Sequence, residues 1–233
     1  MGVRINKYIA SSGFCSRRQA DELVESGKVT VDGEVAVNGT VVEEGSIVKV
    51  DGKEIFPEEK KIYIALHKPL GITCTTDRRD PSNIIDYVGM DDRIFPIGRL
   101  DKNSSGLILL TNDGDIVNKL LRSENGHEKE YQVRVDRKIE PDFKQRMEAG
   151  VEILGQKTLP CKVTVTGTHT FNIVLKQGLN RQIRRMCDAL GYRVTKLRRI
   201  RFINIELGNM KPGDIRNLTR EEIRRLKSSD KTD

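Results

Sequence analysis

The chain has 233 residues, 36% of them hydrophobic and 32% charged, so it is long enough to bury a core beneath a very polar surface. Its net charge of +7 favours a polyanionic partner. The four cysteines and three histidines are scattered, which argues against zinc ribbons and redox pairs, and no apolar run is long enough to span a membrane. We therefore expect a cytoplasmic protein with no metal site and no membrane association.

The first predicted domain, residues 1–56, combines two short helices with two hairpins. RINKYIASSG has apolar residues on one helical face, and Ser16 with Gln19 forms a capping box for a second helix that ends at Gly27. KVTVDGEVAV and IVKVDGKEI then alternate valine or isoleucine with polar residues around Asp-Gly turns. These patterns predict a compact helix pair followed by a small antiparallel sheet.

Positive charge in this domain lies beside the helices, although the domain is not basic overall. Its first 52 residues contain 6 basic and 8 acidic side chains, and most of the acids come after the first helix. A cationic patch on a helix pair can bind RNA phosphates without reading sequence, and a solvated charged face is the alternative. The candidate phosphate contacts are Arg4, Lys7, Arg17, Arg18 and Lys28.

A polar linker at 57–61, PEEKK, precedes the second predicted domain, residues 62–233. Strands and helices are mixed along it without regular alternation, which predicts an α+β fold with a mixed sheet. Asn180 is a predicted helix cap, and Thr219 with Glu222 forms another capping box. The predicted strands are IYIALHK, GLILLT, KEYQVRV, CKVTVTG, FNIVLKQ and VTKLRRIRFINIEL, and the predicted helices are GDIVNKLLR, PDFKQRMEAG, NRQIRRMCDAL and TREEIRRLK.

The segment GRLDKNSSG admits three interpretations of Asp101. Asp101, Asn103, Ser105 and Gly106 occupy the spacing of the first ligands of an EF-hand calcium loop, but the last position is Asn112 and a strand, not a helix, follows. Calcium binding is therefore not expected. A structural salt bridge and a reactive carboxylate both remain open from the residues alone.

A carboxylate can act as a covalent nucleophile if a cation keeps it ionised and a hydrophobic or aromatic wall excludes water. Candidates for both partners exist at a distance in the sequence. They are Tyr131 in KEYQVRV and the arginines of NRQIRRM. The sequence does not show whether these groups come together.

Several ordered motifs together resemble one enzyme family. GRLDKNSSGLILLTNDGD, EKEYQVRV, GLNRQIRRMCDALGY and TKLRRIRFINIEL are similar to successive motifs of the RNA pseudouridine synthases, in the subgroup typified by RsuA. Residues 4–52 resemble the small RNA-binding domain that a small-subunit ribosomal protein shares with tyrosyl-tRNA synthetases. Within the subgroup, HEKEYQV and LNRQIRRMC look most like a large-subunit member. The resemblance implies an RNA-binding domain followed by a mixed-sheet catalytic domain.

The resemblance also implies a reaction, the isomerisation of uridine to pseudouridine in folded RNA, which requires no cofactor. It makes Asp101 the nucleophile, and attack on the ribose, attack on the uracil ring and proton abstraction all stay open. Tyr131 would stack on the displaced base and move the proton that leaves carbon 5. Arg184 would form a bidentate pair with Asp101, and Leu197 would supply an apolar wall.

Further arginines are expected to contact the RNA. By resemblance, Arg99 would hold the RNA open around a base flipped out of its stack. Nine basic residues and one acid lie between residues 176 and 201, where helical spacing places Arg184 inward and Arg181 and Arg185 towards RNA. For Arg99 the plain alternative is a phosphate contact or a surface salt bridge. For the other three arginines it is a solvated basic helix.

The expected partner is ribosomal RNA, of the large subunit or its precursor, bound by a monomer. A tRNA anticodon loop, alone or as a second substrate, is one alternative. The other alternative is a non-catalytic RNA-binding factor in ribosome assembly, for which the first domain and the arginine cluster would suffice.

Overall fold

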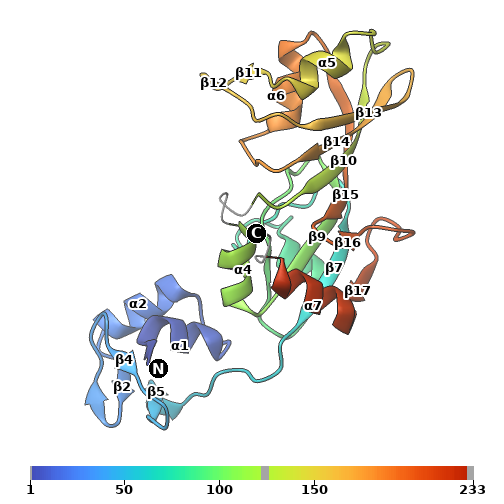
Figure 1. The fold of residues 1–233 in the computed structure, drawn as a ribbon. Helices are drawn as coiled ribbons and strands as arrows, with labels where there is room; N and C mark the ends of the chain where they lie inside the picture. Colours follow the sequence, from blue (N-terminus) through green and yellow to red (C-terminus); the bar gives the residue numbers. More distant parts are fainter. Residues whose placement is uncertain (1, 122–125, 230–233) are drawn as a thin grey trace. The chain divides into compact units, whose positions relative to one another are not determined.

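The computed structural model describes residues 2–121 and 126–229, and the chain forms two compact units (Figure 1). The first unit reaches Ile62 and takes in Asp91–Arg93 and Asn112–Gly114, and the second contains the remainder. The segment predicted to be a linker, 57–61, therefore groups with the first unit. In the described ranges, no helix has both the length and the apolarity that a membrane crossing needs.

The first unit packs two helices against small antiparallel sheets. In its larger sheet the strand order is β3-β2-β5-β6, and β1 pairs with β4. Both hairpins turn on Asp-Gly with positive φ at each residue, 52° and 89° at Asp32 and Gly33, which is the backbone twist that suits two-residue hairpins. The elements are α1 (Ile5–Ser11), α2 (Arg17–Glu25), β1 (Val3–Arg4), β2 (Val29–Val31), β3 (Glu34–Val35), β4 (Val41–Val42), β5 (Val48–Val50) and β6 (Lys53–Glu54).

The predicted capping box at the start of α2 is present. The Ser16 hydroxyl accepts from the Gln19 amide at 3.2 Å, and the Gln19 side chain accepts from the Ser16 amide at 3.0 Å. Two amides that lack partners within the helix are thereby satisfied. Beneath the helix, Ile5, Ile9, Ala20 and Val24 are buried in the core of the unit.

Replacing this cap should destabilise α2 locally. We expect Ser16→Ala to lower the free energy of opening of the α2 amides by about 1 kcal/mol, because it removes one acceptor from the helix start. Native-state hydrogen exchange measures this directly. Ser26→Ala is the matched control, since Ser26 lies at the other end of the same helix and its hydroxyl only donates to the Leu23 carbonyl. Equal effects of the two substitutions would contradict the capping role.

The second unit is built on one mixed sheet with the strand order β13-β14-β10-β15-β9-β7-β17. All of these pairs are antiparallel except β15 with β9. The additional strands β16 and β8 pair with β15 and β9. The strands are β7 (Tyr63–Lys68), β8 (Phe95–Pro96), β9 (Ser105–Thr111), β10 (Lys129–Val135), β13 (Lys162–Gly167), β14 (Thr170–Leu175), β15 (Val194–Phe202), β16 (Ile205–Glu206) and β17 (Ile215–Asn217).

Among the described residues of this unit, two large hydrophobic clusters form core regions. One is built around Phe143, Phe171 and Met186, and the other around Leu107, Leu109 and Phe202. Figure 1 shows α5 and α6 near β13 and β14, and α4 and α7 near β9 and β7. The helices are α3 (Ile84–Val88), α4 (Gly114–Leu121), α5 (Phe143–Glu148), α6 (Gln182–Ala189) and α7 (Arg220–Ser228), and a small hairpin pairs β11 (Glu152–Ile153) with β12 (Gln156–Lys157).

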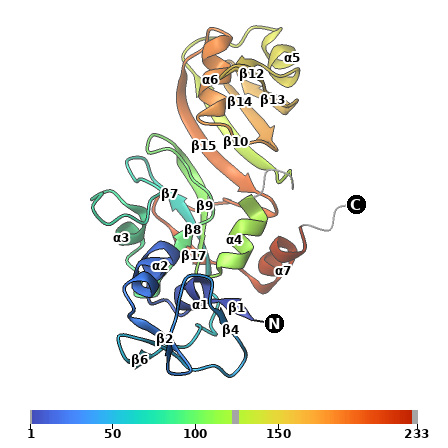
Figure 2. The ribbon, with the colours of Figure 1, turned by 90° about the vertical axis from the view of Figure 1, so that its left-hand side faces the viewer.

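The strand β15 joins the two halves of the sheet, as Figure 2 shows, because it pairs with β10 on one side and β9 on the other. The parallel junction with β9 is short, with Arg198 opposite Ser105 and Arg199 opposite Gly106. At Gly106 φ is +108°, and a Cβ there would lie 2.2 Å from the Arg199 carbonyl oxygen. Only glycine allows this approach of the two backbones.

Two local predictions differ from the structure, and part of a third is not described by it. The run VTKLRRIRFINIEL is not one strand, because Ile203 adopts a φ of +55° and the chain turns there between β15 and β16. Asn180 does not cap α6. The cap position is Arg181, whose φ is +49°, and the Asn180 side chain instead accepts from Arg185 at 3.2 Å. The last residue of the predicted helix GDIVNKLLR, Arg122, lies outside the described residues.

Candidate active site

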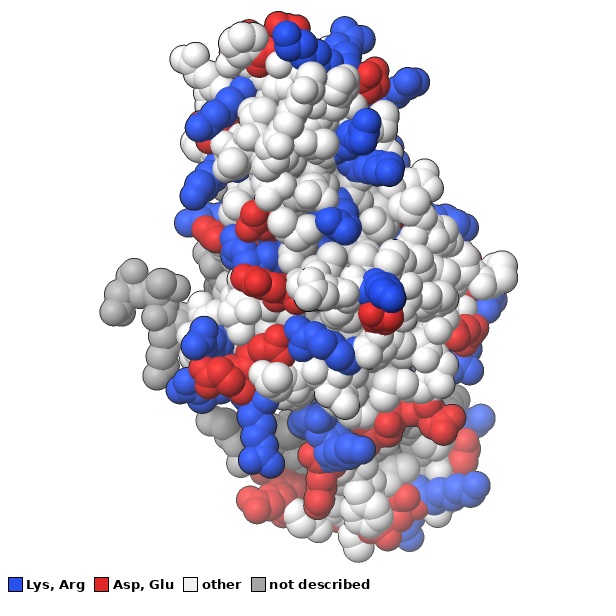
Figure 3. All heavy atoms as spheres, turned by 90° about the vertical axis from the view of Figure 1, so that its right-hand side faces the viewer, with Lys and Arg blue, Asp and Glu red and all other residues white. Residues whose placement is uncertain are grey.

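A cleft of about 620 Å³ opens in the second unit above the junction of β10, β15 and β9. Asp101 is the only acidic residue among the described residues that line it. Six basic residues share the lining, namely Arg99, Lys102, Lys129, Lys176, Arg181 and Arg199. Figure 3, by contrast, shows basic and acidic side chains interspersed over one outer face. The cleft is therefore a strongly positive site around a single carboxylate.

The loop that carries Asp101 is held by backbone hydrogen bonds. It turns tightly, with the Ser104 amide bound to the Asp101 carbonyl at 2.9 Å. On one side the Leu100 amide donates to the buried Cys74 sulfur at 3.3 Å, and on another the Gly71 amide donates to the Lys102 carbonyl at 2.9 Å. Asp101 itself is half-buried. Because the loop is anchored on both sides of it, its carboxylate is presented to the cleft in a defined position.

Arg184 anchors the same loop from α6, and here the predicted bidentate pair with Asp101 is wrong. The Arg184 guanidinium donates to the Asn103 carbonyl at 2.7 Å, the Ser104 hydroxyl at 3.3 Å and the Val194 carbonyl at 3.3 Å. No ion pair within 4.0 Å joins Arg184 to Asp101 in the described part of the chain. The turn after Asp101 brings the Asn103 carbonyl within reach of the Arg184 guanidinium. The guanidinium therefore binds the loop backbone instead of the Asp101 carboxylate.

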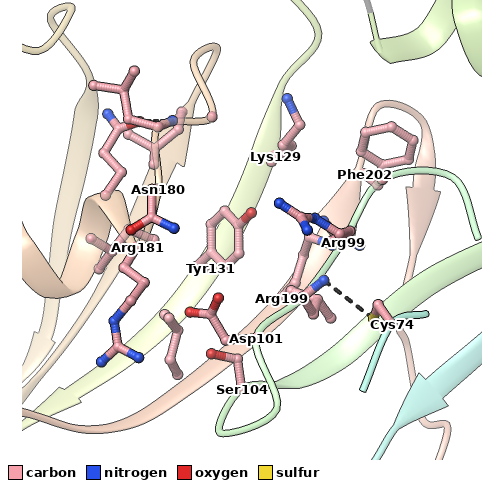
Figure 4. A pocket seen from close by; sticks show the side chains of 18 of the residues that line it. Cys74, Arg99, Asp101, Ser104, Lys129, Tyr131, Asn180, Arg181, Arg199 and Phe202 are labelled. Carbon is pink, nitrogen blue, oxygen red and sulfur yellow. Dashed lines mark hydrogen bonds between the residues drawn. The ribbon is translucent and has the colours of Figure 1, made fainter. Parts of the chain in front are cut away.

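Tyr131 faces Asp101 across the cleft. It lies on β10 opposite Arg199 of β15, and Figure 4 shows the Asp101 carboxylate directed towards its ring. Leu197, also on β15, is buried and lines the same cleft. The structure therefore brings Asp101, Tyr131 and Leu197 together, although 30 or more residues separate each from the next.

Two cations, one buried and one half-buried, interact with the charge of Asp101. Lys68 is fully buried, and its ammonium donates to the carbonyls of Pro69 and Ile72, each at 2.8 Å. Burial lowers the pKa of Lys68, while Cys74 and Asp101 raise it. Burial and Arg181 likewise lower the pKa of Arg184, and the Asp101 carboxylate raises it. The Asp101 carboxylate thus stabilises the charged form of both cations.

The other predicted RNA contacts in this unit are not equivalent. Arg99 and Arg181 are exposed side chains that line the cleft, on the Asp101 loop and at the start of α6. Arg185 does not line it, because its guanidinium folds back onto Asn180, at 3.1 Å from the carbonyl and 3.2 Å from the side-chain oxygen. Arg185 is thus not part of this cleft, and its orientation towards RNA stays a prediction.

In the first unit, the five predicted phosphate contacts surround the helix pair. Arg17 and Arg18 open α2 and are exposed, and Arg4 and Lys28 are exposed at the start of α1 and after α2. Lys7 is half-buried within α1. This placement suits phosphate binding by a helix pair, because long cationic side chains reach the solvent around it.

Several residues of the cleft were not predicted from the sequence, among them Lys129, Arg199 and Phe202. Lys129 lies two residues before Tyr131 on β10, so strand alternation places it on the same face and could have indicated it. Arg199 and Phe202 line the cleft from β15, where a bulge opposite Glu130 and Tyr131 shifts the register. That bulge has no sequence signal, so their orientation was not predictable. No cluster of three metal-ligating side chains occurs within residues 2–121 and 126–229.

Comparison with known proteins identifies both parts of the chain. The family model described as RNA pseudouridylate synthase matches residues 62–189, and the S4 domain model matches residues 3–48. The dual-specificity RNA pseudouridine synthase RluF of Salmonella typhi is 52% identical over 95% of this chain and 77% of its own length. The predicted similarity was to RluF, a large-subunit member of the subgroup, and this relative confirms it.

Two further matches extend over the full length. The ribosomal large subunit pseudouridine synthase B of Bacillus subtilis is 36% identical, with 97% of this chain and 96% of that protein covered. A crystal structure of a pseudouridylate synthase superposes with a TM-score of 0.70 at 27% identity, covering 96% of this chain and 99% of the other. The predicted α+β architecture, an RNA-binding domain followed by a mixed-sheet domain, is confirmed.

Proposed function

Because this chain belongs to the RNA pseudouridylate synthase family and isomerises uridine in RNA to pseudouridine, we propose that Asp101 is its nucleophile and that large-subunit ribosomal RNA and transfer RNA are its substrates. One observation supports Asp101 above all. It is the single acid in a cleft lined by six basic residues, and it faces Tyr131. A salt bridge of purely structural purpose would not require an anchored loop that leaves the carboxylate facing open space.

The reaction breaks the bond from ribose C1′ to uracil N1 and forms a bond from C1′ to C5 after the base turns. N1 gains a proton and C5 loses one. Asp101 supplies the nucleophile, and Tyr131 stacks on the base and relays the proton from C5. Leu197 is the apolar wall that limits how the detached base moves. Arg184 acts as a positioning residue, since it holds the loop on which Asp101 lies.

The uridine must leave its stack to reach a half-buried carboxylate. Arg99 is placed to hold the RNA open around it, because it is exposed on the same loop two residues before Asp101. Arg181 lies on another wall of the cleft and contacts phosphate there. The domain at residues 1–56, through the cations Arg4, Lys7, Arg17, Arg18 and Lys28, docks on structured RNA, and residues 62–233 carry out the chemistry.

Two classes of substrate follow from two relatives. The relative from Bacillus subtilis is named for the ribosomal large subunit, and the RluF proteins are named for dual specificity. Since this chain is 52% identical to RluF, we assign it both large-subunit ribosomal RNA and transfer RNA. It acts as a monomer in the cytoplasm, because one chain supplies the cleft and its substrates are located there.

Tritium release tests the activity and its substrates. Ribosomal RNA and bulk tRNA, each labelled with tritium at C5 of uridine, are incubated with the purified chain, since each turnover frees one C5 hydrogen. We expect release from both RNAs, and sequencing of the products then locates the modified uridine. Release from only one RNA would reject dual specificity. RNA binding without release from any RNA or precursor particle would instead support the non-catalytic assembly factor.

A further inference from the structure

Two cations at one end of the cleft have no acidic partner in the part of the chain that the structure describes. Arg199 is only 3% exposed, its Nε donates to the Leu107 carbonyl at 2.7 Å, and its Nη2 is buried without a hydrogen-bond partner among these residues. Lys129 donates one long bond, 3.4 Å to the His127 carbonyl. Both residues flank the Phe202 ring, with Lys129 Nζ 6.0 Å and Arg199 Cζ 5.5 Å from its centroid.

Two neighbouring, partly desolvated cations repel each other, and the Phe202 ring and the two carbonyls offset that cost only in part, because they carry no full negative charge. Burial lowers the pKa of Lys129, and the charge of Arg199 lowers it further. A bound anion would offset the repulsion and would satisfy Arg199 Nη2. Asp101 does not serve as this anion, since it forms no ion pair within 4.0 Å with either cation among the described residues, and Figure 4 shows Lys129 beyond the Tyr131 ring from the Asp101 carboxylate.

We propose that Lys129 and Arg199 form an anion subsite that binds a single phosphodiester of the substrate RNA next to the target uridine. This inference rests on the proposed function. Lys129 and Tyr131 lie two residues apart on one strand face, about 7 Å along β10, which is within the length of one nucleotide. A base stacked on Tyr131 therefore leaves an adjacent phosphate beside Lys129. A neutral uracil carbonyl would not compensate two positive charges.

The subsite defines the orientation in which a nucleotide binds in the cleft. The uracil and C1′ then lie towards Asp101, and the phosphate lies towards Lys129 and Phe202. Phosphate binding thereby fixes which way the nucleotide enters, and it keeps two negative groups apart. Lys129 and Arg199 act through the backbone of the RNA, so they position the substrate and take no part in the bond exchange.

Replacing one charged phosphate of the RNA by an uncharged methylphosphonate tests the proposal. The RNA fragment in which the modified uridine is located is synthesised with one methylphosphonate, either 5′ or 3′ of that uridine. For the unaltered protein, kcat/KM should fall at least about tenfold at one of the two positions, the loss of one charge-assisted contact. The kcat/KM of the Lys129→Met variant with the natural RNA should be reduced by the same factor. In that variant the methylphosphonate should cause no further loss of kcat/KM.

The controls separate this subsite from general effects. Lys129→Arg should restore the sensitivity to methylphosphonate, and Lys138→Met, an exposed site just beyond β10, should behave as the unaltered protein. Circular dichroism verifies folding of each variant. Additive losses from Lys129→Met and the methylphosphonate, or no loss at either phosphate, would overturn the subsite while leaving the enzyme active. Absence of turnover by the unaltered protein would instead overturn the proposed function.

Discussion

Asp101→Asn should reduce turnover by at least about 10⁴-fold, because an amide of the same shape is not a nucleophile. The substitution leaves the anchors of the loop intact, since these use the backbones of Leu100, Lys102 and Asn103 and not the carboxylate. RNA affinity should stay within a few fold or increase, because one negative charge leaves a cleft lined by six basic residues. Tritium release and filter binding measure the two quantities.

Asp142→Asn is the matched control for this loss of charge. Asp142 lies just before α5, outside the cleft, and its carboxylate contacts Arg146 at 3.4 Å on the surface. Turnover by this variant should stay within twofold of the unaltered protein. Retention of even a tenth of normal turnover by Asp101→Asn would exclude Asp101 as nucleophile. Loss of RNA binding in parallel would show a structural role.

Gly106→Ala should lower kcat by about 100-fold or more and destabilise the second unit by about 2–4 kcal/mol. A Cβ at Gly106 would meet the Arg199 carbonyl oxygen at 2.2 Å and its amide nitrogen at 2.5 Å. Both neighbours are backbone atoms of the paired strand, so no side chain can turn away. The strands β9 and β15 must then separate, which displaces the Asp101 loop from Tyr131 and Leu197.

Gly155→Ala is the control that measures the cost of the backbone conformation without a clash. The difference between the two variants then gives the steric part of the effect. Gly155 also has a positive φ, +72°, but a Cβ there would meet nothing within 4 Å. Thermal unfolding should therefore show about 1 kcal/mol of destabilisation from the backbone conformation alone, with kcat unchanged. If both variants lose the same stability and Gly106→Ala keeps its kcat, the close approach of β9 and β15 does not position the site.

Most of the elements could be predicted because local patterns decide them. The strand KEYQVRV alternates inward and outward residues and is β10 with the same limits, and the boxes at Ser16 and Thr219 mark the starts of α2 and α7. Elements without such a pattern were missed. The five-residue α3 starts at a cap, Asn83, that is 1% exposed, and its packing rather than its periodicity fixes it.

Local sequence patterns alone did not predict how the residues of the site come together. Asp101, Tyr131 and Leu197 were identified by resemblance to a family, and no local rule states that loop, strand and strand meet. The contacts of Arg184 depend on the turn after Asp101, whose carbonyl comes within 2.7 Å of the guanidinium. The orientation of Arg199 depends on a bulge that only strand pairing reveals. Long-range pairing thus supplied what the sequence could not.

The central position of β15 also has a consequence for the nascent chain. Asp101 precedes β9 and Tyr131 lies on β10, and in the finished sheet β15 lies between these two strands. Residues 194–202 must therefore be synthesised and inserted before Asp101 and Tyr131 share a cleft. Because synthesis runs from the N-terminus, the RNA-binding domain emerges and folds well before that strand. A growing chain can therefore hold RNA while it is still unable to modify it.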